Sequence, residues 1–421
     1  MRKLFIAGLT AAAMCFGAIT FATPGSAARE SSFVAGQIMV KFRDSKAAAA
    51  VLASRGLSDG PGIGSTGARL ISVPAGKELQ LVEALNRNPA VEYAEPDETV
   101  TAATDDTYFN RQYALQNSGQ SFTNTKGDIF VAGGTPDADV DAVEAWSTTT
   151  GSDIKVAVLD SGVASDNPDI APKVQAQANF SSSATKRGDA AAEDYYGHGT
   201  HVAGIVAATA NNSQGVAGVC PGCMVLAGKV LSDTGMGSTS ALANGIDWAV
   251  KNGANVINMS LAVRASRTLE TAVNNAWNSG NGAVLVAAAG NGGNESKFYP
   301  GAYANVIAVG ATDNNDNKAS FSTYGSSWVD VAAPGLSVYS TFPNHTFALA
   351  SQYNRSQGYD IGSGTSMASP IVAAVAALAW KSHTGATAKS VRANVESSGE
   401  IKAGTETYWA HGRVNALNAV K

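Results

Sequence analysis

From residue 107 onward, short and almost wholly apolar runs alternate with amphipathic segments. The apolar runs are Ile154–Leu159, Val225–Val230, Val256–Met259, Ala283–Ala288 and Val306–Val309. Runs of this kind are typical of strands buried on both faces, and the segments between them have the apolar spacing of helices. The alternation therefore predicts an α/β fold: a three-layer, doubly wound, mostly parallel sheet.

Three helices of this domain can be bounded. Apolar side chains recur at helical spacing in two stretches, one ending at Gly253 (Leu242, Ile246, Ala249 and Val250) and one ending at Gly280 (Leu269, Val273, Ala276 and Trp277). The third helix, from Met367 to Trp380, is apolar almost all round, so we expect it to be buried.

The first 28 residues have the composition of an export signal. A positive start, Met1-Arg2-Lys3, precedes an apolar stretch from Leu4 to Ala22 and the small residues Gly25-Ser26-Ala27-Ala28. A membrane anchor is the alternative interpretation. No later segment has the ~18 consecutive apolar residues that a membrane span needs. We therefore predict residues 1–28 to be a signal peptide and the mature protein to be secreted, extracellular and free of the membrane.

Residues 29–104 are predicted to form a small α+β domain of their own. Strands are expected at Gln37–Phe42, Ala68–Val73 and Val91–Ala94, and helices at Lys46–Ser54 and Glu78–Asn88. A sheet covered by two helices on one side is a ferredoxin-like arrangement.

Charge and cysteine content narrow the class of protein. A net charge of -5 with 15% charged residues offers no basic face for nucleic acid. Cys15 leaves with the signal, so Cys220 and Cys223 remain as a C-x-x-C pair within a turn. In an oxidising compartment a local disulfide is the preferred interpretation, and redox catalysis is the rival.

Four residues at strand ends and helix starts suggest hydrolytic chemistry. Asp160 follows the strand Ile154–Leu159 directly, and His198 lies in the glycine-rich segment Gly197-His198-Gly199-Thr200-His201. Ser366 stands at the head of the buried helix, and Asn291 follows the strand Ala283–Ala288. A carboxylate can orient a histidine that activates a serine, and an amide can stabilise an oxyanion. Taken singly, each has a simpler interpretation as a helix cap or a turn former.

In the order Asp160, His198, Asn291, Ser366, these blocks closely resemble the subtilisin-like serine proteases. The resemblance extends over Asp105 to Lys421. It is closest to the thermitase-type branch, judged by three further segments: Tyr108-Phe109 with Arg111-Gln112-Tyr113, Asn314 to Gly325, and Tyr408-Trp409 with Gly412-Arg413-Val414-Asn415.

The resemblance implies a serine endopeptidase with polypeptide substrates, and it implies where they bind. One edge of the substrate site would be Ser260, Leu261 and Ala262, although the family usually has Gly in place of Ala262. The opposite edge would include Gly235 and Gly237. The specificity pocket would include Ala289, Gly290 and Phe298. Because Phe298 replaces a usually small or polar residue, we hypothesise a narrow pocket that favours small side chains before the cut; alternatively the ring turns outward.

The resemblance also implies one structural Ca²⁺ ion and an inhibitory propeptide. The calcium ligands would be Asp106, Asp169, Thr209, Asn212, Gln214 and Val216, which offer the hard oxygens that calcium prefers. A second calcium site is not expected in the segment 179–194, whose pattern and length differ from the thermitase pattern. Residues 29–104 would chaperone the folding of the peptidase domain, residues 105–421, and then block its active site, with self-cleavage between Val100 and Thr107. We expect the mature enzyme to be a monomer.

Three other functions are alternatives to a serine peptidase. An α/β-hydrolase esterase would need G-x-S-x-G and the order Ser, Asp, His, and this chain has neither. A metal hydrolase using His198, His201 and Asp194 would lack an H-E-x-x-H motif. A catalytically silent binding protein on the same scaffold stays open from the sequence.

Overall fold

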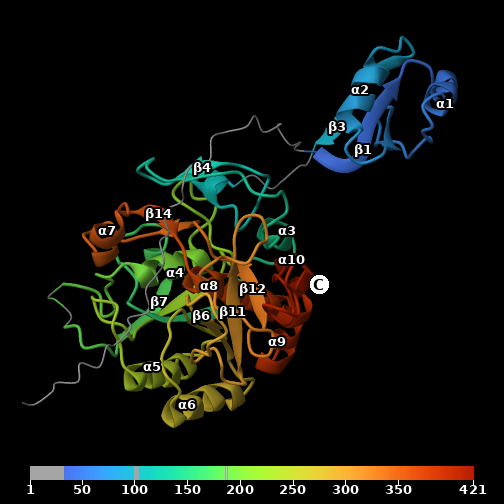
Figure 1. The fold of residues 1–421 in the computed structure, drawn as a ribbon. Coiled ribbons are helices and arrows are strands. Elements are labelled where there is room, and N and C mark those ends of the chain that lie inside the picture. Colours follow the sequence, from blue (N-terminus) through green and yellow to red (C-terminus); the bar gives the residue numbers. More distant parts are fainter. Residues whose placement is uncertain (1–32, 99–103, 185, 187) are drawn as a thin grey trace, which may run out of the picture. The chain divides into compact units, whose positions relative to one another are not determined.

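The computed structural model describes residues 33–98, 104–184, 186 and 188–421, which belong to two compact units (Figure 1). One unit contains residues 33–98, and the other begins at residue 104. The predicted signal peptide, and residues 99–103 of the segment around the predicted cleavage site, lie outside the described residues.

The small unit is an antiparallel sheet with two helices. Its strands are β1 (Phe33–Phe42), β2 (Ala68–Ser72) and β3 (Val91–Glu98), in the order β2-β1-β3. The helices are α1 (Ser45–Ala53) and α2 (Glu78–Asn86). Ile38, Ile71 and Leu85 are each fully buried in its core. The elements follow the sequence prediction in type and order, and the sheet has three strands.

The large unit is built on a seven-stranded sheet in which every neighbouring pair is parallel. In spatial order the strands are β12 (Val331–Pro334), β11 (Val306–Thr312), β10 (Val284–Ala288), β9 (Val256–Met259), β6 (Lys155–Asp160), β8 (Met224–Lys229) and β7 (Val174–Asn179). The five predicted strands are all present, so the predicted fold class is confirmed.

The two edge strands, β7 and β12, were missed. β7 reads VQAQAN, and its residues are only partly buried or exposed, so it lacks the continuous apolar run by which the central strands are recognised. β12 reads VAAP and ends in proline, a residue confined to edge strands and strand ends because it cannot donate to the ladder.

Helices cover both faces of the large sheet (Figure 1). α4 (His198–Ala207) and α8 (Thr365–Ser382) pack on one face, with α9 (Ala388–Ser397) and α10 (Ala416–Val420) beside α8 and α3 (Ala142–Ala145) beside α10. α5 (Thr239–Lys251) and α6 (Arg267–Asn278) cover the other face. The apolar sequence of α8 is explained by its place in the core, where every residue from Thr365 to Ala379 is buried.

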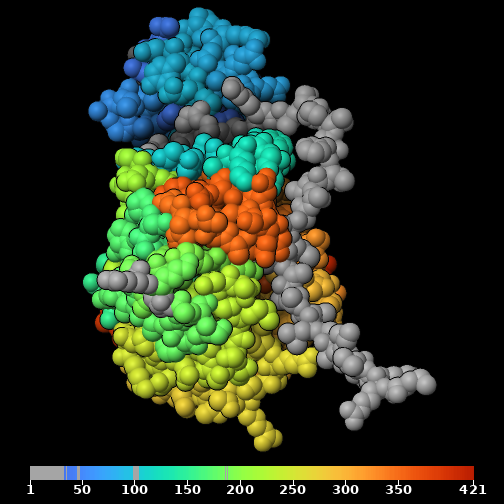
Figure 2. All heavy atoms as spheres, turned by 90° about the vertical axis from the view of Figure 1, so that its left-hand side faces the viewer, coloured from blue at the N-terminus to red at the C-terminus, as the bar shows by residue number. Residues whose placement is uncertain are grey.

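A long connection lies between two short strands that precede α8. β13 (Val338–Thr341) and β14 (Tyr359–Gly362) form a hairpin whose connection carries α7 (Ala348–Tyr353). Figure 2 shows this connection in orange between the teal hairpin of β4 (Phe122–Thr123) and β5 (Phe130–Val131) and the green segments that surround α4. Lys126 Nζ donates to Asn354 Oδ1 at 2.6 Å, and His345 Nδ1 lies 2.8 Å from Asp166 Oδ2.

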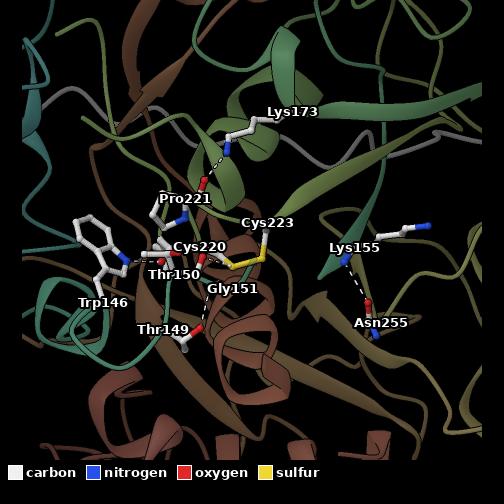
Figure 3. Close-up of a disulfide and its surroundings, with 11 residues drawn as sticks. Trp146, Thr149, Thr150, Gly151, Lys155, Lys173, Cys220, Pro221, Cys223 and Asn255 are labelled. Atoms are coloured by element: carbon white, nitrogen blue, oxygen red, sulfur yellow. Dashed lines mark hydrogen bonds between the residues drawn. A yellow bond between two sulfur atoms is a disulfide. The ribbon is translucent and has the colours of Figure 1, made fainter. Parts of the chain in front are cut away.

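Cys220 and Cys223 form the predicted local disulfide (Figure 3). Both sulfurs are buried, and they cover Gly151 so closely that a Cβ there would lie 2.1 Å from the Cys220 sulfur. Gly222 N also donates to Thr150 O at 2.7 Å. A redox-active pair needs an accessible, activated thiol. The buried position therefore favours a structural role that fixes the turn before β8 and supports the segment before β6.

Within the described ranges, no helix is both long and apolar enough to cross a membrane.

Candidate active site

The site begins at the carboxyl end of β6. All strands of the large sheet run in one direction, so their carboxyl ends share one edge, where ligands of doubly wound sheets bind. Asp160 is the last residue of β6 and is fully buried. Its Oδ1 accepts a hydrogen bond from Ser161 N at 2.7 Å and lies 2.7 Å from His198 Nδ1. The predicted pairing of Asp160 with His198 is therefore present in the structure.

His198 is the first residue of α4 and is 1% exposed. Gly197, just before it, has φ of 100°, which a glycine adopts readily, and a Cβ there would lie 2.3 Å from the Phe347 ring. Burial by itself disfavours the imidazolium, but the charge and hydrogen bond of Asp160 outweigh it, so the pKa of His198 is raised. His198 Nε2 has no hydrogen-bond partner within the described part of the chain.

Ser366 lies in the first turn of α8, which packs alongside α4. It is 7% exposed, and its Oγ donates to Ser260 O at 3.3 Å. In return, Ser260 Oγ donates to Ser366 O at 2.8 Å. A hydrogen bond between Ser366 and His198 Nε2 is not among the contacts of the described residues. Such bonds are often long in enzymes without substrate and tighten when substrate binds.

Asn291 is joined to the same loop. Its Oδ1 accepts from Thr365 N at 2.9 Å and from Thr365 Oγ1 at 3.0 Å, which fixes the amide orientation. A Cβ on Gly364 would lie 3.2 Å from Asn291 Nδ2, so the amide nitrogen is held against the backbone that leads into Ser366. This position suits a donor to an oxyanion formed at Ser366.

The predicted substrate-binding segments border this edge. Ser260, Leu261 and Ala262 follow β9, and a bridge joins Val263 to Tyr299. Gly235 and Gly237 belong to a tight turn that is closed by a hydrogen bond from Ser232 N to Met236 O at 2.7 Å.

Phe298 packs on Gly290 in the predicted specificity pocket. A Cβ on Gly290 would lie 2.7 Å from the Phe298 ring, and Gly290 N donates to Thr365 Oγ1 at 3.0 Å. Ala289, between β10 and Gly290, is fully buried. The ring therefore lies against the pocket segment rather than turned away from it.

The predicted calcium ligands come together around two buried carboxylates. Asp169 Oδ2 accepts from Val216 N at 2.8 Å, and its Oδ1 accepts from Asn212 Nδ2 at 2.7 Å. Asp106 accepts from Asn212 N at 3.2 Å. Thr209 Oγ1 donates to Asp169 O at 3.0 Å, and Gln214 N donates to Asn212 Oδ1 at 2.9 Å. The described residues contain no cluster of three or more acidic, histidine or cysteine ligands, so any further donors here would be neutral oxygens.

The electrostatics of this pair suit a cation. Burial, with the nearby Asp106 charge, raises the pKa of Asp169 to about 6, and burial likewise raises the pKa of Asp106. Two carboxylates together with amide and main-chain oxygens make up the hard donor set that Ca²⁺ prefers. The residues fit the ion, provided that the Asn212 amide turns its oxygen towards it.

The metal-hydrolase alternative does not match the geometry. His201 Nε2 lies 3.2 Å from Asp360 O, and its ring centre lies 4.7 Å from that of Phe342. Burial lowers the pKa of His201 to about 3. Both oxygens of the Asp194 carboxylate accept hydrogen bonds from backbone and hydroxyl donors. His198, His201 and Asp194 therefore do not converge on one point.

Sequence reasoning missed the residues that support the pair of Asp160 and His198. Ser161 and Thr200 both donate hydrogen bonds to Asp194, a residue for which the sequence suggested only a role as a metal ligand. One signal was present: a carboxylate a few residues before a helix start is a common capping feature.

Comparison with known proteins gives the family. Residues 151–411 match the model of the subtilase family, and residues 22–97 match that of the fervidolysin N-terminal prodomain. Thermitase of Thermoactinomyces vulgaris is 47% identical over 283 residues, which cover 67% of this chain and 94% of thermitase. A thermophilic serine proteinase of Bacillus sp. (strain AK1) is 38% identical over 399 residues, covering 93% of this chain and 88% of that protein.

A solved structure supports the same assignment. A protease of Pseudoalteromonas arctica PAMC 21717 superimposes with a TM-score of 0.64 and 31% identity, over 76% of this chain and 99% of that one. The sequence similarity thus extends over both units, and the similarity to the solved structure covers 76% of the chain. The chain belongs to the subtilase family of serine peptidases, in the thermitase-like branch, and carries an N-terminal prodomain.

Proposed function

We propose that the chain is the precursor of a secreted serine endopeptidase with Asp160, His198 and Ser366 as its catalytic triad. Residues 1–28 are the signal peptide, residues 29–104 the propeptide and residues 105–421 the peptidase. The observation that carries the proposal is the buried 2.7 Å contact between Asp160 and His198, at the sheet edge where Ser366 begins α8.

Acylation follows from the roles of these groups. Ser366 Oγ attacks the peptide carbonyl carbon as its proton passes to His198 Nε2, while Asp160 holds the imidazole tautomer and stabilises the imidazolium. The oxyanion accepts hydrogen bonds from Asn291 Nδ2 and from Ser366 N–H, which lies in the first turn of α8, where helix N–H groups have no intrahelical partner. The C–N bond breaks, and Nε2 gives the proton to the leaving amine.

Deacylation reverses these roles with water. His198 Nε2 takes a proton from water as its oxygen attacks the acyl carbonyl carbon. The bond from that carbon to Ser366 Oγ then breaks, and Oγ regains its proton from Nε2. The products are a carboxylic acid and the free enzyme.

The substrate polypeptide is proposed to lie as an added strand between Ser260–Ala262 and Gly235–Gly237. The packing of Phe298 on Gly290 supports a narrow pocket for the side chain before the cut. We expect peptides with Ala at that position to be cleaved faster than matched peptides with Phe. Equal rates for the two would contradict the role given to Phe298.

One structural Ca²⁺ ion is proposed at Asp106 and Asp169, with oxygens of Thr209, Asn212, Gln214 and Val216. When bound, the ion would offset the repulsion between the two carboxylates and join the loop after α4 to residues near the start of the peptidase unit. Its role is stability, and it takes no part in the reaction.

The propeptide and export assignments rest on other observations. The match of residues 22–97 to a prodomain family supports an autoprocessed precursor whose N-terminal unit first inhibits the enzyme. The charged start and apolar stretch of residues 1–28 support secretion.

The first test is casein hydrolysis by the parent protein and by Ser366→Ala, each with and without a serine-directed covalent inhibitor. We expect activity in the parent alone, and complete loss with the inhibitor. Activity that persists in Ser366→Ala would refute the nucleophile assignment. No activity in a fully processed parent would favour a silent binding protein.

Sequencing the N-terminus of the mature protein tests the processing site.

A further inference from the structure

A buried carboxylate that the proposed mechanism does not use lies close to the triad. Asp194 is fully buried and precedes His198 by four residues. Its two oxygens accept five hydrogen bonds. The donors are Ser161 Oγ (2.9 Å), Tyr196 N (3.1 Å) and Gly197 N (2.8 Å) to Oδ1, and Thr200 N (2.8 Å) and Thr200 Oγ1 (2.7 Å) to Oδ2.

These bonds hold the backbone on both sides of His198. The first N–H groups of a helix have no intrahelical partner, and a carboxylate there also interacts favourably with the helix dipole. Gly197 and Thr200 are attached to the same carboxylate, one before His198 and one after it. Rotation of the α4 N-terminus, which would move the imidazole, would therefore break several buried hydrogen bonds at once.

Ser161 links this cap to the other member of the pair. Its Oγ donates to Asp194 and accepts from Gly199 N at 2.9 Å, while its N–H donates to Asp160 Oδ1, the oxygen that contacts His198. A closed ring of contacts thus runs from Asp160 to His198, along the backbone to Asp194, and back through Ser161.

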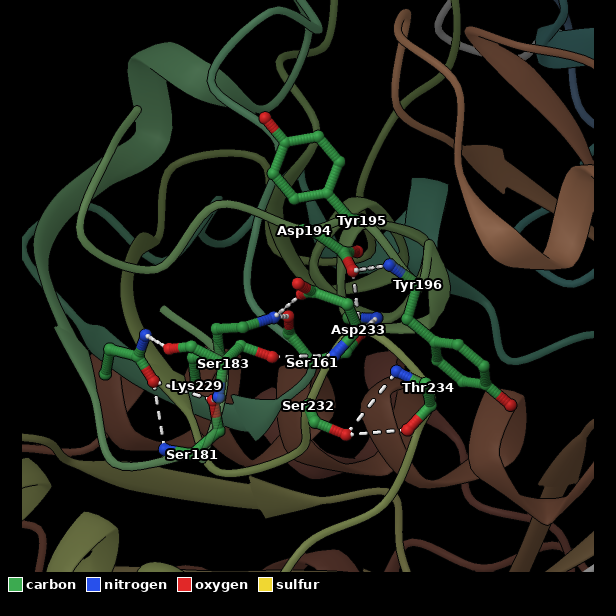
Figure 4. Close-up of polar contacts among 12 residues, drawn as sticks. Ser161, Ser181, Ser183, Asp194, Tyr195, Tyr196, Lys229, Ser232, Asp233 and Thr234 are labelled. Atoms are coloured by element: carbon green, nitrogen blue, oxygen red, sulfur yellow. Dashed lines mark hydrogen bonds and ion pairs between the residues drawn. The ribbon is translucent and has the colours of Figure 1, made fainter. Parts of the chain in front are cut away.

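The ring is anchored on its far side by a buried lysine. Figure 4 shows Ser161 between Asp194 and Lys229. Lys229 is 2% exposed, donates to Ser161 O and pairs with Asp233 at 2.8 Å. Lys229 and Asp160 are also direct partners in the pairing of β8 with β6. The main chain of Ser161 is therefore held as firmly as its side chain.

The charge of Asp194 also acts on His198. Asp194 forms no salt bridge within the described residues, so no cation offsets its negative charge directly. After the larger contributions of burial and Asp160, Asp194 is a further cause that raises the pKa of His198. Among the described residues, two further titratable groups interact with His198: Tyr196, at 6.5 Å between ring centres, and His201, which burial keeps neutral.

We infer that Asp194, acting through Ser161 and the N-terminus of α4, is a positioning residue that fixes His198 against Asp160 and favours the imidazolium formed in each proton transfer. The inference rests on the proposed triad and adds two residues to its support. Neither side chain needs to touch the substrate.

The experiment measures pH profiles of kcat and kcat/KM on a small chromogenic peptide, with thermal unfolding of each variant in parallel. Ser161→Ala cuts the link but keeps the Asp194 charge. We expect kcat to fall about tenfold to a hundredfold with the acid limb of the profile unmoved. Asp194→Asn removes the charge. We expect a similar loss of kcat and an acid limb that moves to lower pH, because without the Asp194 charge the imidazole of His198 stays neutral to lower pH.

Asp189→Asn is the matched control, since it removes a carboxylate from the same segment without touching α4, and it should keep the parent profile. An unmoved acid limb in Asp194→Asn, or a parent-like kcat in Ser161→Ala, would overturn the inference. If Asp194→Asn fails to fold, the test rests on Ser161→Ala. A loss of kcat in Ser161→Ala with an unchanged unfolding temperature would support the positioning role. Activity in a parallel Ser366→Ala sample would instead mark failure of the triad proposal.

Discussion

At the scale of single residues, the site depends on side chains that are buried and held by several bonds. Asp160, His198 and Asp194 are all nearly inaccessible, so the solvent contributes little to their orientation. Asn291 is held differently. Its amide oxygen accepts two hydrogen bonds from Thr365, and its amide nitrogen lies close to the loop before Ser366. The amide is thus preorganised before any substrate binds.

Replacing Asn291 with alanine should therefore slow the chemical step without weakening substrate binding. We expect kcat to fall about a hundredfold to a thousandfold with KM little changed, a size borrowed from such an asparagine in a subtilisin. Steady-state kinetics on one peptide measure both constants. Asn294→Ala, in the same loop, is the control and should retain the parent kcat. A rise in KM alone would show that Asn291 binds substrate rather than the transition state.

A second residue prediction concerns His201, whose pKa burial lowers to about 3 from an ordinary value near 6.5. Between these values the unfolded chain binds a proton that the folded chain does not, so stability falls as the pH is lowered from about 6.5 to 3. The full difference is up to about 5 kcal/mol.

Replacing His201 with asparagine removes this titration and can preserve a donor to Asp360 O. We expect the variant to lose less unfolding free energy between pH 7 and pH 4 than its parent does. Urea unfolding at both pH values, carried out on Ser366→Ala backgrounds to prevent self-digestion, measures the difference. Equal losses in the two proteins would show that His201 is not a source of acid lability.

At the scale of elements, the turn between α4 and β8 is fixed by packing around the disulfide. The pair spans only three positions of sequence, so it removes little freedom from the unfolded chain. The loop-entropy relation gives about 2 kcal/mol for so short a loop. Its sulfurs pack against Gly151, and so the bond also supports the segment that enters β6.

Replacing both Cys220 and Cys223 with serine should lower the free energy of unfolding by about 2 kcal/mol and leave kcat unchanged. Thermal and urea unfolding of the double variant on a Ser366→Ala background measure stability, and peptide hydrolysis by the active form measures kcat. A large loss of kcat at a temperature where the protein is folded would revive the redox alternative.

At the scale of the whole molecule, the peptidase unit is predicted to depend on calcium. Asp106, near its start, and Asp169, after β6, are brought together by the loop after α4, so the ion would join distant segments. A ligand at a hundred times its Kd stabilises the folded state by about 2.7 kcal/mol.

A chelator should therefore lower the unfolding temperature, and added Ca²⁺ should restore it. Asp169→Asn should abolish this response. Asp330→Asn is the matched control: Asp330 is also largely buried and its pKa is raised to about 6, but it pairs with Arg392 and lies outside the proposed site. Differential scanning calorimetry, on Ser366→Ala backgrounds with and without chelator, measures all three proteins. An undiminished calcium response in Asp169→Asn would place the ion elsewhere.

The sequence by itself determined the central strands, the buried helix α8 and the blocks that carry the catalytic residues. These features are local: an apolar run or a glycine-rich motif can be recognised without knowing what packs against it. The edge strands β7 and β12 were not recognisable from the sequence. Each pairs with a strand on one side only, so its residues become a strand through that pairing. Tertiary structure alone decided that the His201 side chain turns into the core. It also decided that Asp194 and Ser161 complete a ring of contacts with Asp160 and His198, which lie 38 positions apart in the sequence. Hydrogen-bond partners of buried polar groups are set by three-dimensional proximity, which spacing along the chain does not encode.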